Sequence, residues 1–197
     1  MLVGILTASI LVLTINVIPC VHSFGHSYVI KKDWLSGALS REFSVYDKTE
    51  KVLKYRIESQ FAFRHNNKIV AYPSKQVLGK LNGRWSLKGY VGDISFLDQS
   101  TNRWIGGNIT EISNWRMREF MINWNGTNIN LKGQVDLLPK QFYEKGRGEL
   151  LAQYKIRPAS RLWAARYDMD IFSIKYPESL YLLGLAIEEL RSSPPKG

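Results

Sequence analysis

Chemistry in this chain would have to be carried by few side chains. Three of the 197 residues are histidines, and His22 and His26 lie close to the amino terminus, so a general base in the body of the chain would have to be His65. A lone histidine beside a predicted hairpin turn is typical of a surface residue. We therefore predict no Ser-His-Asp or Cys-His catalytic site.

Two further patterns have both a functional and a plainer interpretation. Asp168 and Asp170 would share one face of a strand, where paired carboxylates serve glycoside hydrolysis or metal binding, or simply form an exposed charged face. Gly106-Gly107 does not stand between a strand and a helix, so it predicts a turn and not a phosphate-binding loop. The sequence thus predicts neither an enzyme nor a resident cofactor.

The residues Phe24-Gly25-His26 would form a metal site if they began the mature chain. A free amine, two deprotonated amides and the imidazole of the third residue give four nitrogens in a square plane, which suits Cu(II) or Ni(II). A frayed terminus is the alternative. This interpretation depends on cleavage directly before Phe24.

Positive charge is the strongest compositional signal. Lysine and arginine number 27 against 17 aspartate and glutamate residues, a formal net charge of +10, which favours anionic partners. Basic residues interleaved with aromatic residues can bind anionic lipid, sulfated glycan or nucleic acid, while charge scattered over a soluble surface is the alternative. The candidate ligand-binding residues form one group with Trp85 and Tyr90 among them and a second beside Trp163: Arg64, Lys68, Lys75, Lys80, Arg84 and Lys88, then Lys155, Arg157, Arg161 and Arg166.

The first part of the sequence predicts export. No charged side chain precedes Lys31, residues 2–18 are almost wholly apolar, and Pro19 ends this run. Val21-His22-Ser23 fits the end of a signal peptide, so we expect cleavage between Ser23 and Phe24. The apolar run of about 17 residues is at the lower limit for a membrane-spanning helix, and an uncleaved membrane anchor is the alternative.

Export would change three properties of the mature chain. Cys20, the sole cysteine, would be removed, so the domain would be held together by its core without a disulfide. Asn108 and Asn125 begin the sequons Asn-Ile-Thr and Asn-Gly-Thr and would become N-glycan acceptors, both expected in turn-like settings. Nucleic acid would be disfavoured as a partner, and contact with a membrane would be at most peripheral.

Short β-type runs separated by turn signals fill the mature chain, and no linker rich in Pro, Gly or Ser marks a domain boundary. Asn-Gly between apolar runs predicts tight hairpins at Asn82-Gly83 and Asn125-Gly126, because both residue types tolerate positive φ. Asn66-Asn67 is expected to form a turn as well. By this reading the chain has roughly ten to twelve strands.

One segment, residues 177–191, predicts an α-helix. Pro177 suits the first helical position and Glu178 the first turn. From Leu180 onward the segment has no polar face, so the helix must be buried or lie in a membrane, and about ten apolar residues span only about 15 Å, too short for a bilayer. Glu188 and Glu189 are expected to return the chain to water. A helix inside a closed β-barrel satisfies these conditions.

Several segments resemble the tubby-like C-terminal superfamily, which includes the LURP-one-related proteins and the phospholipid scramblases. They are two strand–Asp–turn segments, two later strands and the final helix: Phe43–Asp47, Ile94–Asp98, Leu150–Ile156, Arg166–Ile171 and the helix from Pro177. The resemblance covers residues 41–190 and implies a barrel of short strands around a hydrophobic C-terminal helix. It does not extend to the basic positions through which tubby-type domains bind phosphoinositides, nor to the cysteine cluster, calcium-binding segment and Pro-rich amino end of scramblases.

These observations predict a mainly β protein. A signal peptide would cover residues 1–23, an extension 24–40, a closed antiparallel tubby-like β-barrel with its central helix 41–191, and a tail 192–197. We expect a secreted, non-enzymatic binding module that recognises a phospholipid headgroup, a sulfated glycan or a protein partner through its basic face. The alternatives are a lipocalin-like carrier of a small apolar ligand and, with an uncleaved leader, a scramblase-like membrane-associated protein.

Overall fold

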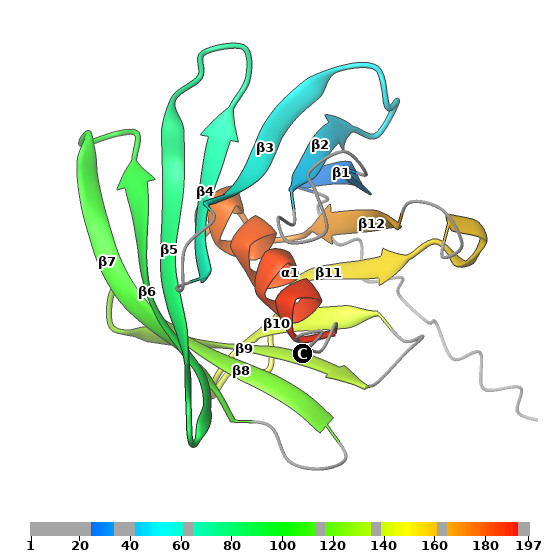
Figure 1. Cartoon of the computed structure of the whole chain (residues 1–197). Coiled ribbons are helices and arrows are strands. Elements are labelled where there is room, and N and C mark those ends of the chain that lie inside the picture. Colours follow the sequence, from blue (N-terminus) through cyan, green and yellow to red (C-terminus); the bar gives the residue numbers. More distant parts are fainter. Residues whose placement is uncertain are drawn as a thin grey trace, which may run out of the picture.

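Alternation of inward apolar and outward polar residues places a large part of the chain in β-strands. The computed structural model describes residues 25–33, 42–60, 65–112, 117–134, 139–160 and 165–192, to which the following statements refer. Within them the chain forms twelve strands, a short 3₁₀-helix η1 and one α-helix (Figure 1). Their bounds are β1 His26–Lys32, β2 Phe43–Asp47, β3 Leu53–Gln60, β4 His65–Ala71, β5 Val77–Ser86, β6 Gly89–Asp98, β7 Arg103–Glu111, β8 Met117–Trp124, β9 Thr127–Gln134, β10 Lys140–Glu144, β11 Leu150–Ile156, η1 Pro158–Ser160, β12 Arg166–Ile171 and α1 Glu178–Ser192.

The twelve strands close into one antiparallel β-barrel, which confirms the predicted fold class. Neighbours around the barrel follow the order of the chain from β2 to β12, and β1 closes the ring by pairing with β12 and with β2. The predicted start of the barrel at residue 41 is therefore wrong, because β1 lies in the segment assigned to an extension. Tyr28 and Ile30 of β1 are buried in the core, which explains why this strand belongs to the barrel.

α1 runs through the middle of the barrel, with strands on all sides (Figure 1). Pro177 directly precedes it, and the helix predicted over residues 177–191 is confirmed. Leu182, Leu183 and Leu185 are essentially inaccessible to solvent, as the lack of a polar face requires. The core therefore lies between α1 and the inner face of the barrel, and α1 fills the interior apart from a cavity where the helix begins.

The two open ends of the barrel are named here after α1. The α1-start mouth contains Glu178 and the turns that follow β2, β6 and β8. Because neighbouring strands are antiparallel, the turn between β5 and β6 lies at the opposite end, the α1-end mouth. Lys32 and Lys140 also lie there and form ion pairs with Glu189 and Glu188, respectively.

The expectation that Glu188 returns the chain to water is wrong. Glu188 is 4% exposed, and its Oε1 lies 2.9 Å from Nζ of Lys140, which projects from the first residue of β10. A buried carboxylate is tolerated only where an opposite charge compensates for its loss of hydration. The barrel wall therefore encloses α1 beyond its apolar stretch.

Three predicted turns are parts of continuous strands. Asn66-Asn67 lies within β4, Asn82-Gly83 within β5 and Gly106-Gly107 within β7. A Cβ on Gly83 would lie 1.9 Å from the hydroxyl oxygen of Tyr90, and one on Gly107 would lie 2.3 Å from the carbonyl oxygen of Asn123. These two glycines thus serve close packing across the sheet, not positive φ.

The other Asn-Gly prediction is confirmed. Asn125 and Gly126 form the turn between β8 and β9 with φ of 48° and 75°, the left-handed conformations that a two-residue hairpin of this kind uses. The two strand–Asp–turn segments also share their local geometry. Oδ1 of Asp47 accepts a hydrogen bond from the Thr49 hydroxyl at 2.9 Å, and Oδ1 of Asp98 accepts one from the Ser100 amide at 3.0 Å.

Candidate functional site

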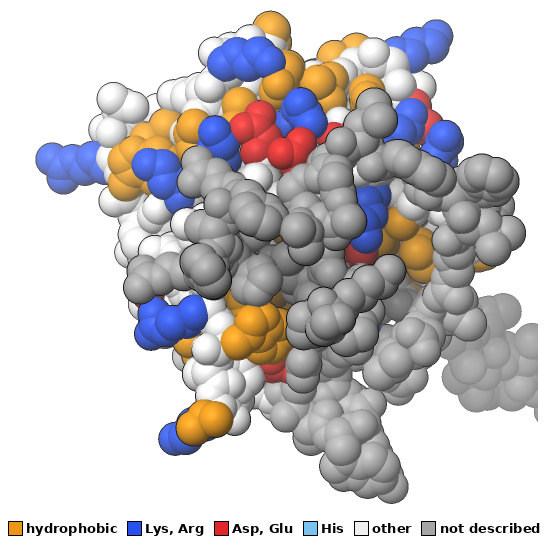
Figure 2. All heavy atoms as spheres, in the orientation of Figure 1, with side chains coloured by type: hydrophobic (Ala, Val, Ile, Leu, Met, Phe, Trp, Pro, Cys, Tyr) orange, Lys and Arg blue, Asp and Glu red, His pale blue; other side chains and the backbone are white. Residues whose placement is uncertain are grey.

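The first group of predicted basic residues does not form one cluster. Its described members lie along β5, beside it on β4, and in the turns at both ends of β5. A ten-residue strand spans about 33 Å at about 3.3 Å per residue, so the ends of the group are far apart. Figure 2 likewise shows basic side chains dispersed around the visible face. These members are Lys68, Lys75, Lys80, Arg84 and Lys88, whereas Arg64 lies outside the described residues.

Three of these side chains have partners within the protein. Lys68 forms an ion pair of 3.1 Å with Glu58. The ammonium groups of Lys75 and Lys80 lie over the rings of Tyr72 and Trp104, 3.5 Å and 4.4 Å from the ring centroids. Such cation–π contacts leave the charge accessible to an anion on the other side.

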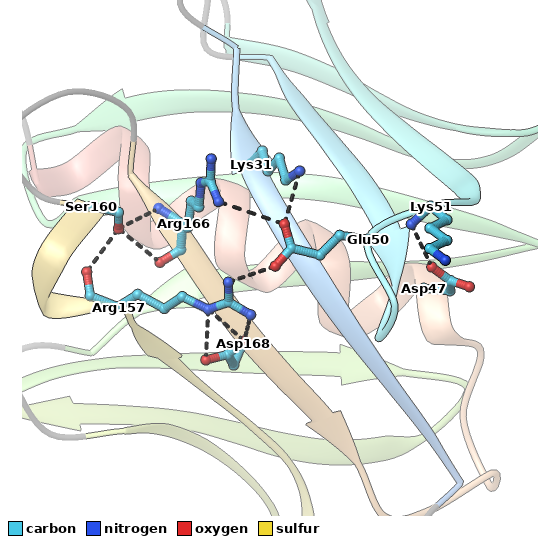
Figure 3. A network of polar contacts seen from close by, with 8 residues as sticks. All are labelled: Lys31, Asp47, Glu50, Lys51, Arg157, Ser160, Arg166 and Asp168. Atoms are coloured by element: carbon cyan, nitrogen blue, oxygen red, sulfur yellow. Dashed lines mark hydrogen bonds and ion pairs between the residues drawn. The ribbon is translucent and has the colours of Figure 1, made fainter.

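The second group is held by acidic side chains on the outside of the barrel (Figure 3). Arg157 donates to Asp168 at 2.6 Å and to Glu50 at 2.7 Å. Arg166 and Lys31 also form ion pairs with Glu50, at 3.6 Å and 2.9 Å. Arg161 lies outside the described residues, and Lys155 is exposed on β11. The predicted second basic face is thus an internal charge network around Glu50.

Glu50 fixes this network because three cations surround it. Hydrogen bonds from Arg157 and Lys31 lower the pKa of the Glu50 carboxyl to about 2. Its backbone has a φ of 60°, which places the side chain from the β2–β3 turn over β1 and β12 (Figure 3). The network therefore joins β1 and β12, the strands that pair where the barrel closes, to the turn between β2 and β3.

The β5–β6 hairpin, at the α1-end mouth, exposes apolar and basic side chains next to each other. Leu87, in its turn, is fully exposed, and Trp85 is 43% exposed. Arg84 and Lys88 are exposed beside them, and neither forms an ion pair within the part of the chain that the structure describes. The Ser86 hydroxyl donates to the carbonyl of Gly89 at 2.7 Å, so the turn is held in one shape. Apolar and basic side chains are thus displayed together on a constrained tip.

A cavity of about 1170 Å³ opens at the α1-start mouth. Apolar and aromatic side chains from β5, β6, β7 and β8 form part of its wall, and the two Asp turns form part of its rim. The residues that define it best are Leu78, Leu97, Ile105, Trp124 and Tyr176 on the wall, Asp47 and Asp98 on the rim, and Tyr28, Tyr55 and Glu178 around one carboxylate.

The Glu178 carboxylate is the polar centre of this cavity. Its Oε2 accepts hydrogen bonds from the hydroxyls of Tyr28 at 2.5 Å and Tyr55 at 2.8 Å, and its Oε1 is hydrogen-bonded to Nδ1 of His26. The two phenol rings meet edge to face with centroids 5.8 Å apart. Strands β1 and β3 and the first turn of α1 therefore converge on one carboxylate.

Both phenols remain protonated at neutral pH. Burial and the hydrogen bond to Glu178 raise the pKa of Tyr28 well above its ordinary value of 10, and burial and the Glu178 charge raise the pKa of Tyr55 to about 12. Each hydroxyl thus donates to Glu178 and retains lone pairs that can accept a hydrogen bond. The two phenol oxygens and the Glu178 carboxylate therefore offer hydrogen-bond acceptors to a ligand in the cavity.

The predicted metal-binding terminus is engaged in other contacts. Nδ1 of His26 binds Glu178, and the Gly25 amide donates to the carbonyl of Ile171 at 2.9 Å. Phe24 lies outside the described residues. A square-planar Cu(II) or Ni(II) site would require these nitrogens to leave their present partners. Across the described ranges, no group of three or more His, Cys, Asp or Glu side chains could hold a metal ion.

The candidate carboxylate pair has separate partners. Asp168 binds Arg157, whereas Asp170 accepts a hydrogen bond from the Ser27 hydroxyl at 2.8 Å. Both lie on the outside of β12, as the strand spacing predicts. His65 is the first residue of β4, and its side chain lies outside the description.

The two predicted sequons differ in setting. Asn125 is exposed in the β8–β9 turn, as expected, and lies at the rim of the cavity. Asn108 is exposed in the middle of β7, so its expected turn-like setting is wrong. Ser23 and the preceding leader residues lie outside the described part of the chain.

Sequence reasoning missed the cavity cluster. Glu178 was assigned to the first turn of α1, and Tyr28 was placed in the extension before the barrel. Their contact joins residues 150 positions apart, so only knowledge of the strand order brings them together. The exposed hairpin tip carried a local signal, because Leu87 stands between a charged residue and a polar one at the end of a strand.

Comparisons of this chain with known proteins identify no family. A scan against protein-family models gives no match, and neither curated proteins nor solved structures match it. The resemblance to the tubby-like superfamily therefore stays a prediction. No helix in the described ranges has the length and apolar character needed to cross a membrane.

Proposed function

We propose that this protein is a secreted, non-enzymatic binding module that docks on anionic phospholipid surfaces through the β5–β6 hairpin. The observation that carries the proposal is the fully exposed Leu87 in the turn, with Arg84 and Lys88 exposed on either side. Exposed apolar side chains next to basic ones that form no ion pair with another described residue match a bilayer interface, where the apolar group enters the headgroup layer and the cations contact phosphate.

The magnitudes favour a lipid surface over a sulfated glycan. Removing a leucine side chain from water contributes about 1.5–3 kcal/mol, which a sulfated sugar with its polar surface does not supply. Each basic residue near an anionic membrane contributes about 1 kcal/mol. Lys68 on β4, Lys75 in the β4–β5 turn and Lys80 on β5 lie farther from the tip and would add only to the general electrostatic attraction.

Vesicle co-sedimentation tests the proposal. We expect the purified protein to bind mixed phosphatidylcholine–phosphatidylserine vesicles, to bind pure phosphatidylcholine weakly, and to lose affinity as salt is raised. Leu87→Ser should weaken binding by about ten- to a hundredfold, and Arg84→Gln or Lys88→Gln by about fivefold each.

Two matched variants serve as controls. Ile174→Ser removes an exposed apolar side chain at the opposite mouth, and Lys155→Gln removes an exposed lysine from β11. Both should bind like the wild type. Equal affinity for neutral and anionic vesicles, or an unchanged Leu87→Ser variant, would reject the proposal.

Export is tested separately. Expression in a secreting cell should deliver a chain that begins at Phe24, with mobility shifted by glycosidase treatment if Asn108 or Asn125 carries a glycan. An intact Met1 on a cell-associated product would instead support the membrane-anchored alternative.

A further inference from the structure

We infer that the cavity at the α1-start mouth binds a small organic cation: a protonated amine on an apolar body. This site is distinct from the lipid-docking tip, which lies at the opposite end of the barrel. The inference rests on the lining of the cavity and on the groups around Glu178.

The polar centre of the cavity recognises donors. The Glu178 carboxylate and the hydroxyl oxygens of Tyr28 and Tyr55 lie within one hydrogen-bonded cluster, and both hydroxyl hydrogens are already directed to Glu178. Oε1 of Glu178 is bonded to His26, so what remains toward a ligand is the carboxylate at Oε2 and the lone pairs of the two phenol oxygens. An ammonium group, with three donors and one positive charge, is the complement of this set.

Of the basic groups that line the cavity, the imidazole of His26 is bonded to Oε1 of Glu178, whereas the lysine ammonium groups lie elsewhere. Lys175 lies on the wall, but its ammonium group contacts both carboxylate oxygens of Glu144 at 2.7 Å and 2.8 Å. Lys48 and Lys54 are exposed on the rim, near the Asp47 carboxylate. The lysine charges thus stay at the edge of the site or in a pair with Glu144, and none of them forms an ion pair with Glu178 in the part of the chain that the structure describes.

The rest of the wall suits an apolar body. Leu78, Leu97 and Ile105 face the cavity together with the ring of Trp124, which packs edge to face on Tyr176 at 6.1 Å between centroids. Aromatic rings next to a carboxylate also attract organic cations through their π faces. The volume of about 1170 Å³ exceeds that of one small amine and is sufficient for a drug-sized ligand.

Isothermal titration with matched probes tests the inference. Tryptamine and hexylamine supply a protonated amine on an aromatic and an aliphatic body, and indole-3-propionic acid and 3-methylindole keep the aromatic body without the positive charge. We expect at least one amine to bind, and the acid and the neutral indole to bind at least about tenfold more weakly. If neither amine binds, or if the acid binds as well as tryptamine, the inference is wrong.

Variants assign the binding to the cluster. Glu178→Gln keeps the size of the side chain and removes its charge, and we expect it to weaken amine binding at least about tenfold. Tyr55→Phe keeps the ring and removes one acceptor, and should weaken binding by a smaller factor; it also decides the question if Glu178→Gln does not fold. Leu87→Ser, at the opposite mouth, should leave amine binding unchanged. Full amine affinity in folded Glu178→Gln or in Tyr55→Phe would overturn the assignment.

Discussion

Substitution of Gly184 tests the position of α1 inside the barrel. Alanine is the better helix former by about 1 kcal/mol, so a helix in open space would gain stability from Gly184→Ala. In this structure a Cβ at residue 184 would lie 2.6 Å and 2.7 Å from two ring carbons of Phe142 on β10. Overpacking of this kind costs about 1–3 kcal/mol. We expect a net loss of about 1 kcal/mol and a fall in Tm of roughly 2–4 °C.

A double-mutant cycle separates this contact from general damage to the core. Phe142→Leu removes the ring atoms that meet the new Cβ, so Gly184→Ala should cost less, or stabilise, in the Phe142→Leu background. Phe120, on β8, is equally buried but supplies none of the three atoms nearest to the Gly184 Cβ position. Phe120→Leu should therefore add to Gly184→Ala without coupling.

Calorimetry or urea unfolding of the single and double variants gives the coupling energy. We expect at least about 1 kcal/mol between residues 184 and 142, and less than about 0.5 kcal/mol between 184 and 120. A Gly184→Ala variant with a raised Tm and no coupling to residue 142 would show that α1 does not approach β10 at this glycine.

Three other experiments test the Glu50 network, the buried Glu188–Lys140 ion pair and the close packing at Gly83. The pKa of Glu50 falls from an ordinary 4.5 to about 2 on folding, so the stability that this carboxylate contributes should be full above about pH 4.5 and be lost as the pH falls toward 2. The difference in Tm between wild type and Glu50→Gln should therefore vanish over that pH range. A difference in Tm that stays constant with pH would contradict the network. Glu188→Ala breaks a buried ion pair and should cost about 3–5 kcal/mol in urea unfolding, with a smaller loss when Lys140→Met accompanies Glu188→Leu. Gly83→Ala should lower Tm more than Gly106→Ala, whose Cβ would meet nothing closer than 3.9 Å, and equal effects would argue against the Tyr90 contact.

Local signals were sufficient for much of the fold. The Asn125-Gly126 hairpin and α1 were predicted from the residues that form them, because each carries its own turn chemistry or apolar pattern, whereas the segments of β11 and β12 were expected from the family resemblance. Asn82-Gly83 has the same local chemistry as a hairpin, yet it lies inside β5, since Gly83 is needed by the ring of Tyr90 on the neighbouring strand. The sequence alone does not distinguish a glycine that allows a turn, such as Gly126, from a glycine that makes room for a neighbouring side chain, such as Gly83.

The candidate sites depend on contacts that no local pattern contains. Arg157 and Arg166 read as a basic face, but Glu50, more than a hundred residues earlier, neutralises them once β1 and β12 close the barrel. Glu178 read as a helix-terminal acid, but barrel closure surrounds it with Tyr28, Tyr55 and His26. Such sites could be predicted only after the position of β1 in the barrel was known.

Closure of the barrel also places different polar groups at its two mouths. At the α1-start mouth the inner polar group is a carboxylate, and Lys175 is paired with Glu144. At the α1-end mouth Lys32 and Lys140 take up the two final glutamates of the helix, and Arg84 and Lys88 stay exposed on the hairpin tip. A protein docked on an anionic surface through this tip would hold the opposite mouth toward water. An amine could then enter the cavity while the protein remains bound, so vesicles should leave amine affinity unchanged; a marked loss of that affinity on vesicles would show that docking uses the α1-start mouth instead.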